Sequence, residues 1–309
     1  MKKILLLVHA PQTRPGHLNW VALRDLLQET IGQDVKVDIS ALSELLLMVD
    51  GSEAHIRDDR QNYDVSDFDL VVFRTIGKET EAAISVAAYC RKRGIPYIDQ
   101  CVPTTGDNKI ACVFVRWEHG LPVPPSAYGP ISSLEQLAKA GTFGWPLVAK
   151  SNNGKKGRDN FLVNDVAELN RALNNNPEVR FIMQRFIPNT GDYRILTLNG
   201  QPRMAILRTA AADTHLNNTS QGGEAKVVSL SDMPEEILEL SRQSANLEKL
   251  AIAGVDIVVD SQTKKPYILE VNKSPQLATG FEVKEKMRHY ADALRELLDD
   301  NNTEKDQTE

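Results

Sequence analysis

The segment AGVDIVVDSQTKKPYILEVNKSP, residues 253–275, constrains the fold more than any other part of the 309-residue chain. Two runs rich in β-branched residues flank a polar turn, which is the pattern of a β-hairpin. A turn centred on Thr263 places Asp256 opposite Glu270, since both lie at equal distance from the centre. Side chains alternate along a strand, so Asn272 shares the face of Glu270. The hairpin therefore gathers two carboxylates and an amide on one face of a sheet.

These two carboxylates repel each other, and neither has a cationic neighbour in its own strand. Hard oxygen ligands of this kind suit Mg²⁺, which keeps some of its waters and completes its shell with phosphate oxygens. We therefore predict that Asp256, Glu270 and Asn272 are metal ligands. The alternative is that they line the solvated face of an amphipathic hairpin, as most strand carboxylates do.

Four short apolar runs near the start of the chain have the composition of buried strands. They are Ile4–Val8, Val35–Ile39, Leu70–Phe73 and Ile95–Ile98. Between the first two, apolar residues from Trp20 to Ile31 recur at three- and four-residue steps, the spacing of one helix face. Strands that alternate with helices predict an open, mostly parallel sheet. We therefore interpret the opening MKKILLLV as a buried first strand and not as a secretory signal.

After this unit the pattern changes. A helix predicted from about residue 108 to 119 ends at Gly120, before the proline-rich stretch LPVPP. Beyond it, short strands and helices indicate an α+β half with a helix over 235–252, the hairpin, and a last helix with one apolar face. The predicted class is α/β with an α+β C-terminal half. The predicted domains are 1–105, 106–178 and 179–298, followed by a disordered acidic tail at 299–309.

Basic residues accompany two glycine-containing segments. Lys150 ends the strand-like PLVAK, and the loop after it contains Gly154 and Gly157, which free the backbone to approach a phosphate. Lys109 begins a predicted helix, whose N-terminus favours anions. The alternatives are a solvated basic turn at the loop and an ordinary surface lysine at the helix.

Two arginines, Arg194 and Arg208, lie in strand-like segments, where a buried guanidinium needs an anion and an exposed one needs nothing. Asn218 lies in NNTSQGG, which is either a turn carrying a functional amide or a mobile loop.

The formal net charge of −6 is concentrated at the end of the chain. The last eleven residues, DDNNTEKDQTE, hold five acids and one lysine, so the remainder carries only −2. This balance provides no general attraction to nucleic acid or to anionic membranes. No apolar stretch approaches the ~20 residues that span a bilayer. The three cysteines lack a CxxC spacing, which predicts reduced thiols in a cytoplasmic protein.

Several well-known motifs are absent from the sequence. It contains neither the P-loop pattern GxxxxGK[ST] nor the dinucleotide fingerprint GxGxxG. It also lacks the HxxxH spacing of zinc sites and the GxSxG elbow of serine hydrolases. A nicotinamide oxidoreductase, which the alternating N-terminal part would permit, therefore lacks its fingerprint.

Taken in order, the motifs resemble the ATP-grasp superfamily, and within it the branch of the carboxylate–amine ligases RimK and LysX. The resemblance covers nearly the whole chain to Leu298 and is strongest from Gly106 onward. The ordered set that carries it is Lys109, Lys150, the loop Gly154 to Arg158, MQRFI, GDYRI, Arg208, NNTSQGG, GVDIVV and EVNKSP. It implies an N-terminal pre-grasp domain and two ATP-grasp lobes with ATP between them.

The resemblance also implies roles for individual residues. The residues implied to contact ATP are Lys109, Lys150, Gly154, Gly157, Gln184, Arg185, Phe186 and Ile187. Those implied to bind two ions of Mg²⁺ or Mn²⁺ are Asp256, Glu270 and Asn272. Arg208 and Asn218 would face the transferred phosphate, and Asp192 and Arg194 match the family's DxR pair beside the substrate. The implied activity is amide-bond formation through an acyl phosphate, with an amino acid, peptide or protein as substrate and a homo-oligomer as the common assembly.

The sequence departs from the family pattern in two places. Arg185 occupies a position where relatives usually carry an acidic residue, and EVNKSPQ replaces the more frequent ending, which puts Lys273 and Gln276 near the acceptor side. The second departure weakens any transfer of glutamate specificity. A binding module that holds ATP without ligation is the alternative function.

Overall fold

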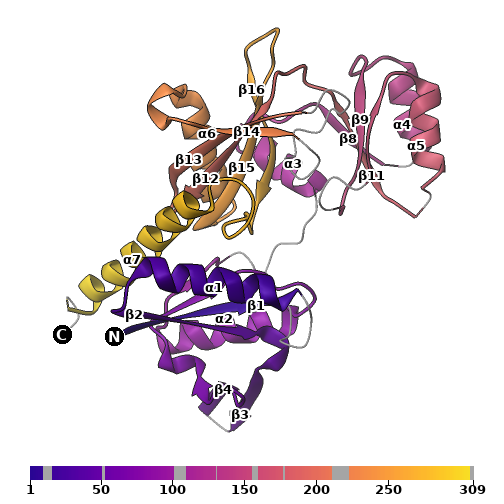
Figure 1. Cartoon of the computed structure of the whole chain (residues 1–309). Helices are drawn as coiled ribbons and strands as arrows, with labels where there is room; N and C mark the ends of the chain where they lie inside the picture. Colours follow the sequence, from indigo (N-terminus) through magenta and orange to yellow (C-terminus); the bar gives the residue numbers. More distant parts are fainter. Residues whose placement is uncertain are drawn as a thin grey trace.

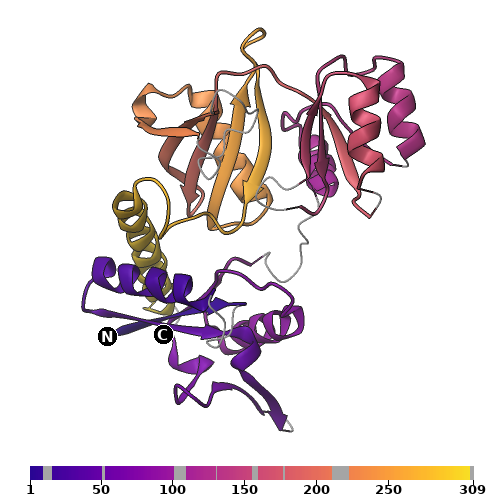
Figure 2. The same cartoon turned by 45° about the vertical axis from the view of Figure 1, so that its right-hand side comes forward.

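The computed structural model describes residues 1–9, 16–50, 53–100, 109–129, 131–154, 159–176, 178–210 and 223–306. Within these residues the strands form four sheets. Three of the sheets are the centres of three lobes, which we call the N-terminal, central and C-terminal lobes (Figures 1 and 2). None of the described helices is both long and apolar enough to cross a membrane.

The N-terminal lobe is built on a parallel sheet with the strand order β2-β1-β6-β7. Its elements are β1 (Lys2–Val8), α1 (His17–Ile31), β2 (Val35–Ala41), β6 (Leu70–Phe73), α2 (Thr80–Arg93) and β7 (Tyr97–Ile98). Each of the four predicted strands is present, although the fourth begins later than predicted. Leu5 and Leu7 of β1 face α2, whereas Ile4 and Leu6 face α1. The sheet is therefore covered by helices on both sides, as parallel sheets are.

A small antiparallel sheet with the order β3-β4-β5 extends from this lobe (Figure 1). Its strands, together with the short 3₁₀ turns beside them, are η1 (Leu42–Glu44), β3 (Leu46–Asp50), β4 (Glu53–Asp58), β5 (Tyr63–Asp64) and η2 (Val65–Asp67). This sheet was not predicted, because its strands are short and carry charges on both faces.

The central lobe has an antiparallel sheet with the order β10-β9-β11-β8. Its elements are α3 (Lys109–Glu118), β8 (Ser126–Tyr128), α4 (Ile131–Lys139), β9 (Leu147–Ser151), β10 (Asn160–Val163), α5 (Val166–Asn174) and β11 (Phe181–Arg185). Helices α4 and α5 pack on one face of the sheet through Leu134, Leu169 and Leu173. Because β11 belongs to this sheet, the central lobe extends past the boundary that we predicted at residue 178.

The C-terminal lobe has an antiparallel sheet with the order β14-β13-β12-β15-β16. Its elements are β12 (Asp192–Leu198), β13 (Gln201–Thr209), β14 (Glu224–Val228), η4 (Leu230–Asp232), α6 (Glu235–Leu247), β15 (Ile252–Val259) and β16 (Pro266–Asn272). Helix α6 covers one face of this sheet. It ends at Leu247, not at Ile252 as predicted, because Lys249 adopts a left-handed conformation (φ 52°) and the Leu250 N–H donates back to the carbonyl of Ala245.

The last helix, α7 (Val283–Asp306), leaves the C-terminal lobe and packs on helix α1 of the N-terminal lobe (Figures 1 and 2). The predicted apolar face is confirmed, since Met287, Tyr290 and Leu294 are buried in one core with residues of α1. The Arg295 guanidinium donates to the Ile31 carbonyl at the end of α1. The helix continues to Asp306, so the first part of the tail that we predicted to be disordered is helical.

A second contact between these two lobes is polar. The buried carboxylate of Asp99, just after β7, accepts hydrogen bonds from the backbone N–H groups of Ala251 (2.6 Å) and Ile252 (3.2 Å). Burial raises the pKa of Asp99 to about 7, although the nearby charge of Arg74 lowers it. The N-terminal lobe is thus fastened to the start of β15, one of the hairpin strands.

Candidate active site

One face of the C-terminal sheet carries a row of alternating charges. Asp192 and Arg194 lie on β12, Arg208 lies on β13 and Asp256 lies on β15. The strand register places Asp192 opposite Arg208 and Arg194 opposite Asp256. Because side chains of alternate residues share a face, the sequence DYR puts the acid and the base of β12 on the same side.

The four side chains form a continuous set of ion pairs. Arg194 binds Asp256 with two hydrogen bonds, from Nε to Oδ1 (2.8 Å) and from Nη2 to Oδ2 (2.7 Å). Arg208 binds Asp192 through Nε (3.2 Å) and Nη2, and its Nη2 lies 3.1 Å from Oδ2 of Asp256. The Arg208 side chain is buried, as are both carboxylates. Because each guanidinium group makes more than one contact with a carboxylate, its direction is fixed.

Burial and ion pairing shift the pKa values of Asp192 and Asp256 in opposite directions. Burial alone would raise the pKa of Asp256, but Arg194 and Arg208 outweigh it and hold that pKa below its usual range. Burial, and then the negative charge of Asp256, raise the pKa of Asp192 to about 6 despite its bond to Arg208. Asp256 is therefore the carboxylate that stays ionised over the whole physiological range.

The hairpin register agrees with the prediction. Asp256 pairs with Glu270, and a bulge follows at the next position of β15. The Nδ2 atom of Asn272 lies 3.3 Å from Oδ2 of Asp256. The turn is held by Asp260, whose Oδ1 accepts from the N–H groups of Gln262 and Thr263.

The protein itself supplies positive charge for Asp256. Neither hairpin strand supplies it; Arg194 and Arg208 reach across from β12 and β13. Glu270 is exposed. In the described part of the chain, no three His, Cys, Asp or Glu side chains converge as a metal site. A cation here would therefore rest on Glu270, Asp256 and the Asn272 amide and would complete its shell with oxygens from other molecules, which fits the chemistry of Mg²⁺.

The start of helix α3 contacts the first residues of the loop after β9. Asn152 accepts a hydrogen bond from the Ile110 N–H at Oδ1 (2.9 Å), and its carbonyl accepts from the Lys109 N–H (3.2 Å). The Lys109 ammonium donates to the carbonyl of Gly154 (2.6 Å). Lys109 thus begins a helix as predicted, and it is joined to the glycine-containing loop.

Three charged groups from the central and C-terminal lobes act electrostatically on Lys150. Burial lowers the pKa of Lys150 to about 8, the charge of Glu270 on β16 raises it, and the charges of Lys109 and Arg116 on α3 lower it further. A half-buried lysine that is influenced by more cations than anions is a site that an anion would stabilise. Arg116 is itself held by Glu248 at the end of α6 (2.5 Å), which links α3 to the C-terminal lobe.

The segment from Gln184 to Ile187 connects the central sheet to the C-terminal sheet. Gln184 is buried on β11, and its Nε2 donates to Oγ of Ser126 (2.6 Å). The N–H of Arg185 donates to the Pro125 carbonyl, and Ile187 is buried. These residues are the end of β11 and the start of the linker to β12, the segment implied by the resemblance to line the adenine.

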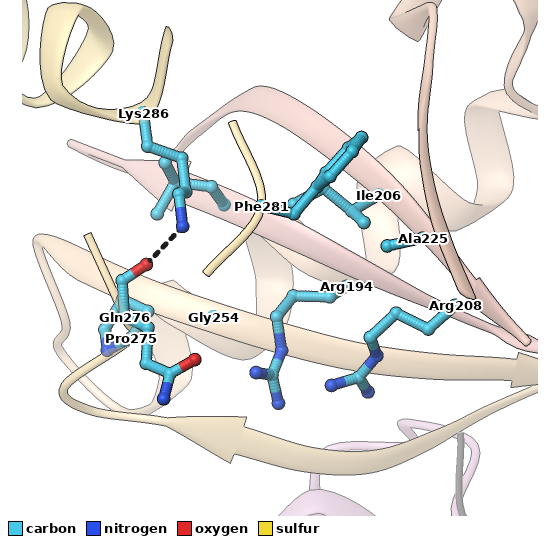
Figure 3. Close-up of a pocket in the computed structure, with 10 residues that line it drawn as sticks. Arg194, Ile206, Arg208, Ala225, Gly254, Pro275, Gln276, Phe281 and Lys286 are labelled. Carbon is cyan, nitrogen blue, oxygen red and sulfur yellow. Dashed lines mark hydrogen bonds between the residues drawn. The ribbon is translucent and has the colours of Figure 1, made fainter. Parts of the chain in front are cut away.

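A pocket lies beside the ion pairs, between the sheet and the segment that leads into α7 (Figure 3). It encloses about 510 Å³, counting the part open to solvent. It is lined by Arg194, Leu196, Ile206, Arg208, Ala225, Gly254, Pro275, Gln276, Phe281 and Lys286.

Comparison with known proteins places this geometry in a family. Residues 106–294, more than half of the chain, match the model of the RimK-like ATP-grasp domain. The chain belongs to the RimK-like ATP-grasp family.

Relatives of this ATP-grasp chain agree with the assignment. It is 32% identical over 169 residues to a probable alpha-L-glutamate ligase of Parasynechococcus marenigrum, covering 53% of this chain and 35% of the relative. The chain spans less than half the length of the first three curated relatives, 40%, 35% and 47%.

Solved ATP-grasp structures share the fold over nearly the whole chain. The ligase PsnB, complexed with a phosphomimetic variant of its minimal precursor, Mg and ADP, superimposes with a TM-score of 0.70 at 14% identity, covering 96% of this chain and 98% of PsnB. The D-alanine–D-alanine ligase of Bacillus anthracis, complexed with ATP, gives a TM-score of 0.68 at 16% identity and covers 98% and 100%. The predicted ATP-grasp fold is confirmed.

Two of the predicted site residues of this ATP-grasp chain, Gly157 and Asn218, lie outside the described residues. Among the others, Asp192, Arg194, Arg208, Asp256, Glu270 and Asn272 lie together on the C-terminal sheet. Lys109 contacts Gly154 in the loop after Lys150, and Gln184 to Ile187 lie apart from both groups, where the central sheet leads into the C-terminal sheet.

Sequence reasoning missed Lys286 and Phe281, which line the pocket from the far side. The signal for Lys286 was its position next to Met287, a residue of the predicted apolar face of the last helix. A lysine beside that face is close enough to the protein body to be buried.

Proposed function

We propose that the chain is an ATP-dependent carboxylate–amine ligase that forms an amide bond through an acyl phosphate. The observation that carries this proposal is the buried set of ion pairs that fixes Arg208 beside Asp192 and Asp256. The charges of Glu270 and Lys109, which both act on the pKa of Lys150, add to it. A nucleoside triphosphate bound with a metal ion needs cations for its phosphates and a carboxylate for the metal. The central lobe supplies the cations, and the C-terminal lobe supplies the carboxylate. ADP and phosphate would be the other products.

The proposed reaction depends on charged groups that are held in fixed positions. A carboxylate oxygen of the substrate attacks the γ-phosphorus, and the bond to the ADP oxygen breaks. An amine nitrogen then attacks the acyl carbon, and phosphate leaves. Both steps need alignment and charge neutralisation more than a covalent protein nucleophile. Accordingly, we assign no general base.

The chain's own residues supply most of this charge. Lys150 and Lys109 would hold the ATP phosphates, and the segment Gln184 to Ile187 would line the adenine. Arg208 would face the transferred phosphoryl group. Its direction is fixed by Asp192 and Asp256 before any ligand binds, so no reorganisation is needed during the reaction.

Asp256, Glu270 and Asn272 would hold two ions of Mg²⁺ or Mn²⁺. When bound, such an ion neutralises charge on the phosphate oxygens. Hard oxygen donors paired across a hairpin support this assignment.

The proposed substrates are a carboxylate and an amine from an amino acid, a peptide or a protein, as the names of the relatives suggest. Cytoplasmic location is part of the proposal and is supported by the buried Cys90, which forms no disulfide. Self-association stays a prediction, which light scattering coupled to size-exclusion chromatography would test.

The test is Mg²⁺-dependent phosphate release from ATP by wild type, Glu270→Ala and Glu236→Ala. Pooled amino acids and a desalted peptide fraction are added separately. Glu236 is exposed on α6, on the other face of the sheet, and serves as the matched control. We expect stimulation in wild type and Glu236→Ala and none in Glu270→Ala, with all three folded by circular dichroism.

Two results would count against the proposal. Unchanged turnover in Glu270→Ala would contradict the metal assignment. ATP binding without release under any addition would favour the alternative, a module that binds ATP without ligation.

A further inference from the structure

The small sheet of the N-terminal lobe has an edge strand that exposes apolar side chains. Within the described residues, β3 is paired with β4 on one side only. Leu46, Leu47 and Met48 are exposed over 43%, 39% and 41% of their surface. Side chains alternate along a strand, so both faces of this edge are apolar. Open backbone N–H and C=O groups beside apolar side chains form a template for another strand.

β3 also lacks the features that usually protect an edge strand. Charged residues, prolines and bulges discourage pairing with a further strand. Residues 46–49 of β3 are uncharged and apolar, and the pairing with β4 continues without a bulge. Other described edge strands differ, since β2 carries Lys36, β14 carries Lys226 and β16 begins with Pro266. The edge of β3 is therefore the one that is open to pairing.

The hairpin of β3 and β4 extends away from the rest of the molecule. It lies at the end of the N-terminal lobe that is remote from the central and C-terminal lobes (Figures 1 and 2). A strand of a second molecule can therefore reach β3 without contact with the two lobes that carry the candidate active site.

The sequence of β3 matches a second copy of itself. Antiparallel pairing about a two-fold axis at the middle residue puts Met48 opposite its counterpart and Leu46 opposite Asp50, and the residues between them meet apolar counterparts. Arg57, whose exposed guanidinium lies 3.4 Å from Asp59, is the neighbour of Leu46 on β4. The basic side of one hairpin thus meets the acidic end of the other β3. Because both copies use the same strand, the contact closes as a dimer.

We propose that the chain forms a two-fold dimer through β3, which joins the two small sheets into one sheet with the strand order β5-β4-β3-β3-β4-β5. The occupant of the edge is a second copy of the chain. The inference assigns a surface to the self-association that the resemblance implies, and it does not rest on the ligase function. One pair of short strands is a small interface, so we expect a dissociation constant in the range of about 1 to 100 μM.

Sedimentation velocity of the full chain measures the association. Wild type, Met48→Lys, Met48→Glu and Val227→Lys are compared from about 1 μM to about 1 mM. Val227 is the matched control, because it is 40% exposed on β14, an edge strand of another sheet. Circular dichroism and thermal unfolding show whether each variant is folded.

We expect wild type and Val227→Lys to dimerise with the same dissociation constant. Met48→Lys and Met48→Glu each put two like charges opposite one another and remove an apolar contact, so each should weaken the dimer by about 10-fold or more. An equimolar mixture of these two variants puts lysine opposite glutamate and should restore the association. Mixing would not repair a damaged hairpin, so this result separates charge repulsion from a loss of structure.

A cysteine at the two-fold axis tests the register directly. Opposite residues of an antiparallel pair have Cα atoms about 4.5–5.5 Å apart, which a disulfide can bridge. Met48→Cys and Val227→Cys are made with Cys101→Ser and Cys112→Ser and are oxidised by air with a copper catalyst, which takes up the two electrons and two protons of the thiols. We expect a covalent dimer from Met48→Cys and none from Val227→Cys on non-reducing denaturing gels.

Three results would overturn the inference. They are a wild type that stays monomeric over the whole concentration range, a Met48→Lys dimer as tight as that of wild type, and a Met48→Cys variant that dimerises without forming the disulfide. The first result would leave the edge of β3 to a strand of a different protein. A dimer that releases no phosphate from ATP would refute the ligase function and leave this inference intact.

Discussion

ATP binding should weaken as the pH rises through the pKa of Lys150. The perturbation is a change from about pH 7 to about pH 9, at which the ATP phosphates keep their charge. Desolvation lowers the pKa of the half-buried Lys150 to about 8; the charge of Glu270 raises this pKa, and the charges of Lys109 and Arg116 lower it. Only the ammonium form attracts phosphate, so the apparent affinity follows the protonated fraction of Lys150.

The magnitude follows from that pKa. A group of pKa 8 is protonated to about 0.9 at pH 7 and to about 0.1 at pH 9, so the dissociation constant of ATP should rise about 10-fold over this range. If bound ATP restores the ordinary pKa of a lysine, binding at pH 9 takes up about 0.9 proton.

The assay is calorimetric titration with ATP at both pH values, repeated in two buffers of different ionisation enthalpy to count protons. Lys150→Arg is the control, because an arginine stays charged throughout and should bind ATP with little change between the two pH values. A pH-independent ATP affinity in wild type, with no proton uptake at pH 9, would refute the reasoning.

Three further outcomes are expected. Arg208→Met leaves the carboxylate of Asp192 buried without its guanidinium and should lower the unfolding free energy by about 3–5 kcal/mol in urea titrations; a loss below about 1 kcal/mol would contradict the ion-pair account. Arg116→Met breaks a buried link between α3 and α6 and should cost several times more than Arg242→Met, which removes an exposed pair worth less than about 1 kcal/mol. Asp99 keeps a proton in the folded chain between about pH 4 and pH 7 while the unfolded chain releases it, so the unfolding free energy falls as the pH rises across this window. Asp99→Asn should flatten this slope in urea midpoints at about pH 5 and pH 7, and equal slopes in both proteins would count against the assignment.

Sequence patterns correctly predicted structural features that depend on residues close together in the chain. The apolar face of α7 follows from residue spacing. The pairing of Asp256 with Glu270 was predicted from a turn centred on Thr263, but the pairs beside the turn are centred between residues 262 and 263, and a bulge at Leu269 restores the predicted pair. The end of α6 was wrong by several residues, because the left-handed Lys249 is not a residue type that announces a helix end.

Contacts between strands that are far apart in the sequence could not be predicted. The sequence pointed to a need for positive charge near Asp256, but a metal ion and a neighbouring arginine satisfy that need equally well. Only the strand order β13-β12-β15 shows that Arg194 and Arg208 meet this carboxylate. The burial of Lys286 likewise depends on where α7 lies against the sheet, and no spacing within the helix reports that.

The position of α7 has a consequence for how the chain is made. The core that contains Leu27 and Ile31 of α1 is completed by Met287 and Leu294 of α7. Roughly 200 residues separate the last strand of the N-terminal lobe from that helix, which a ribosome adds in about 10–40 s. During this interval one apolar side of the newborn N-terminal lobe has no cover from its own chain. The N-terminal lobe should therefore need ribosome-associated chaperones until α7 has been made.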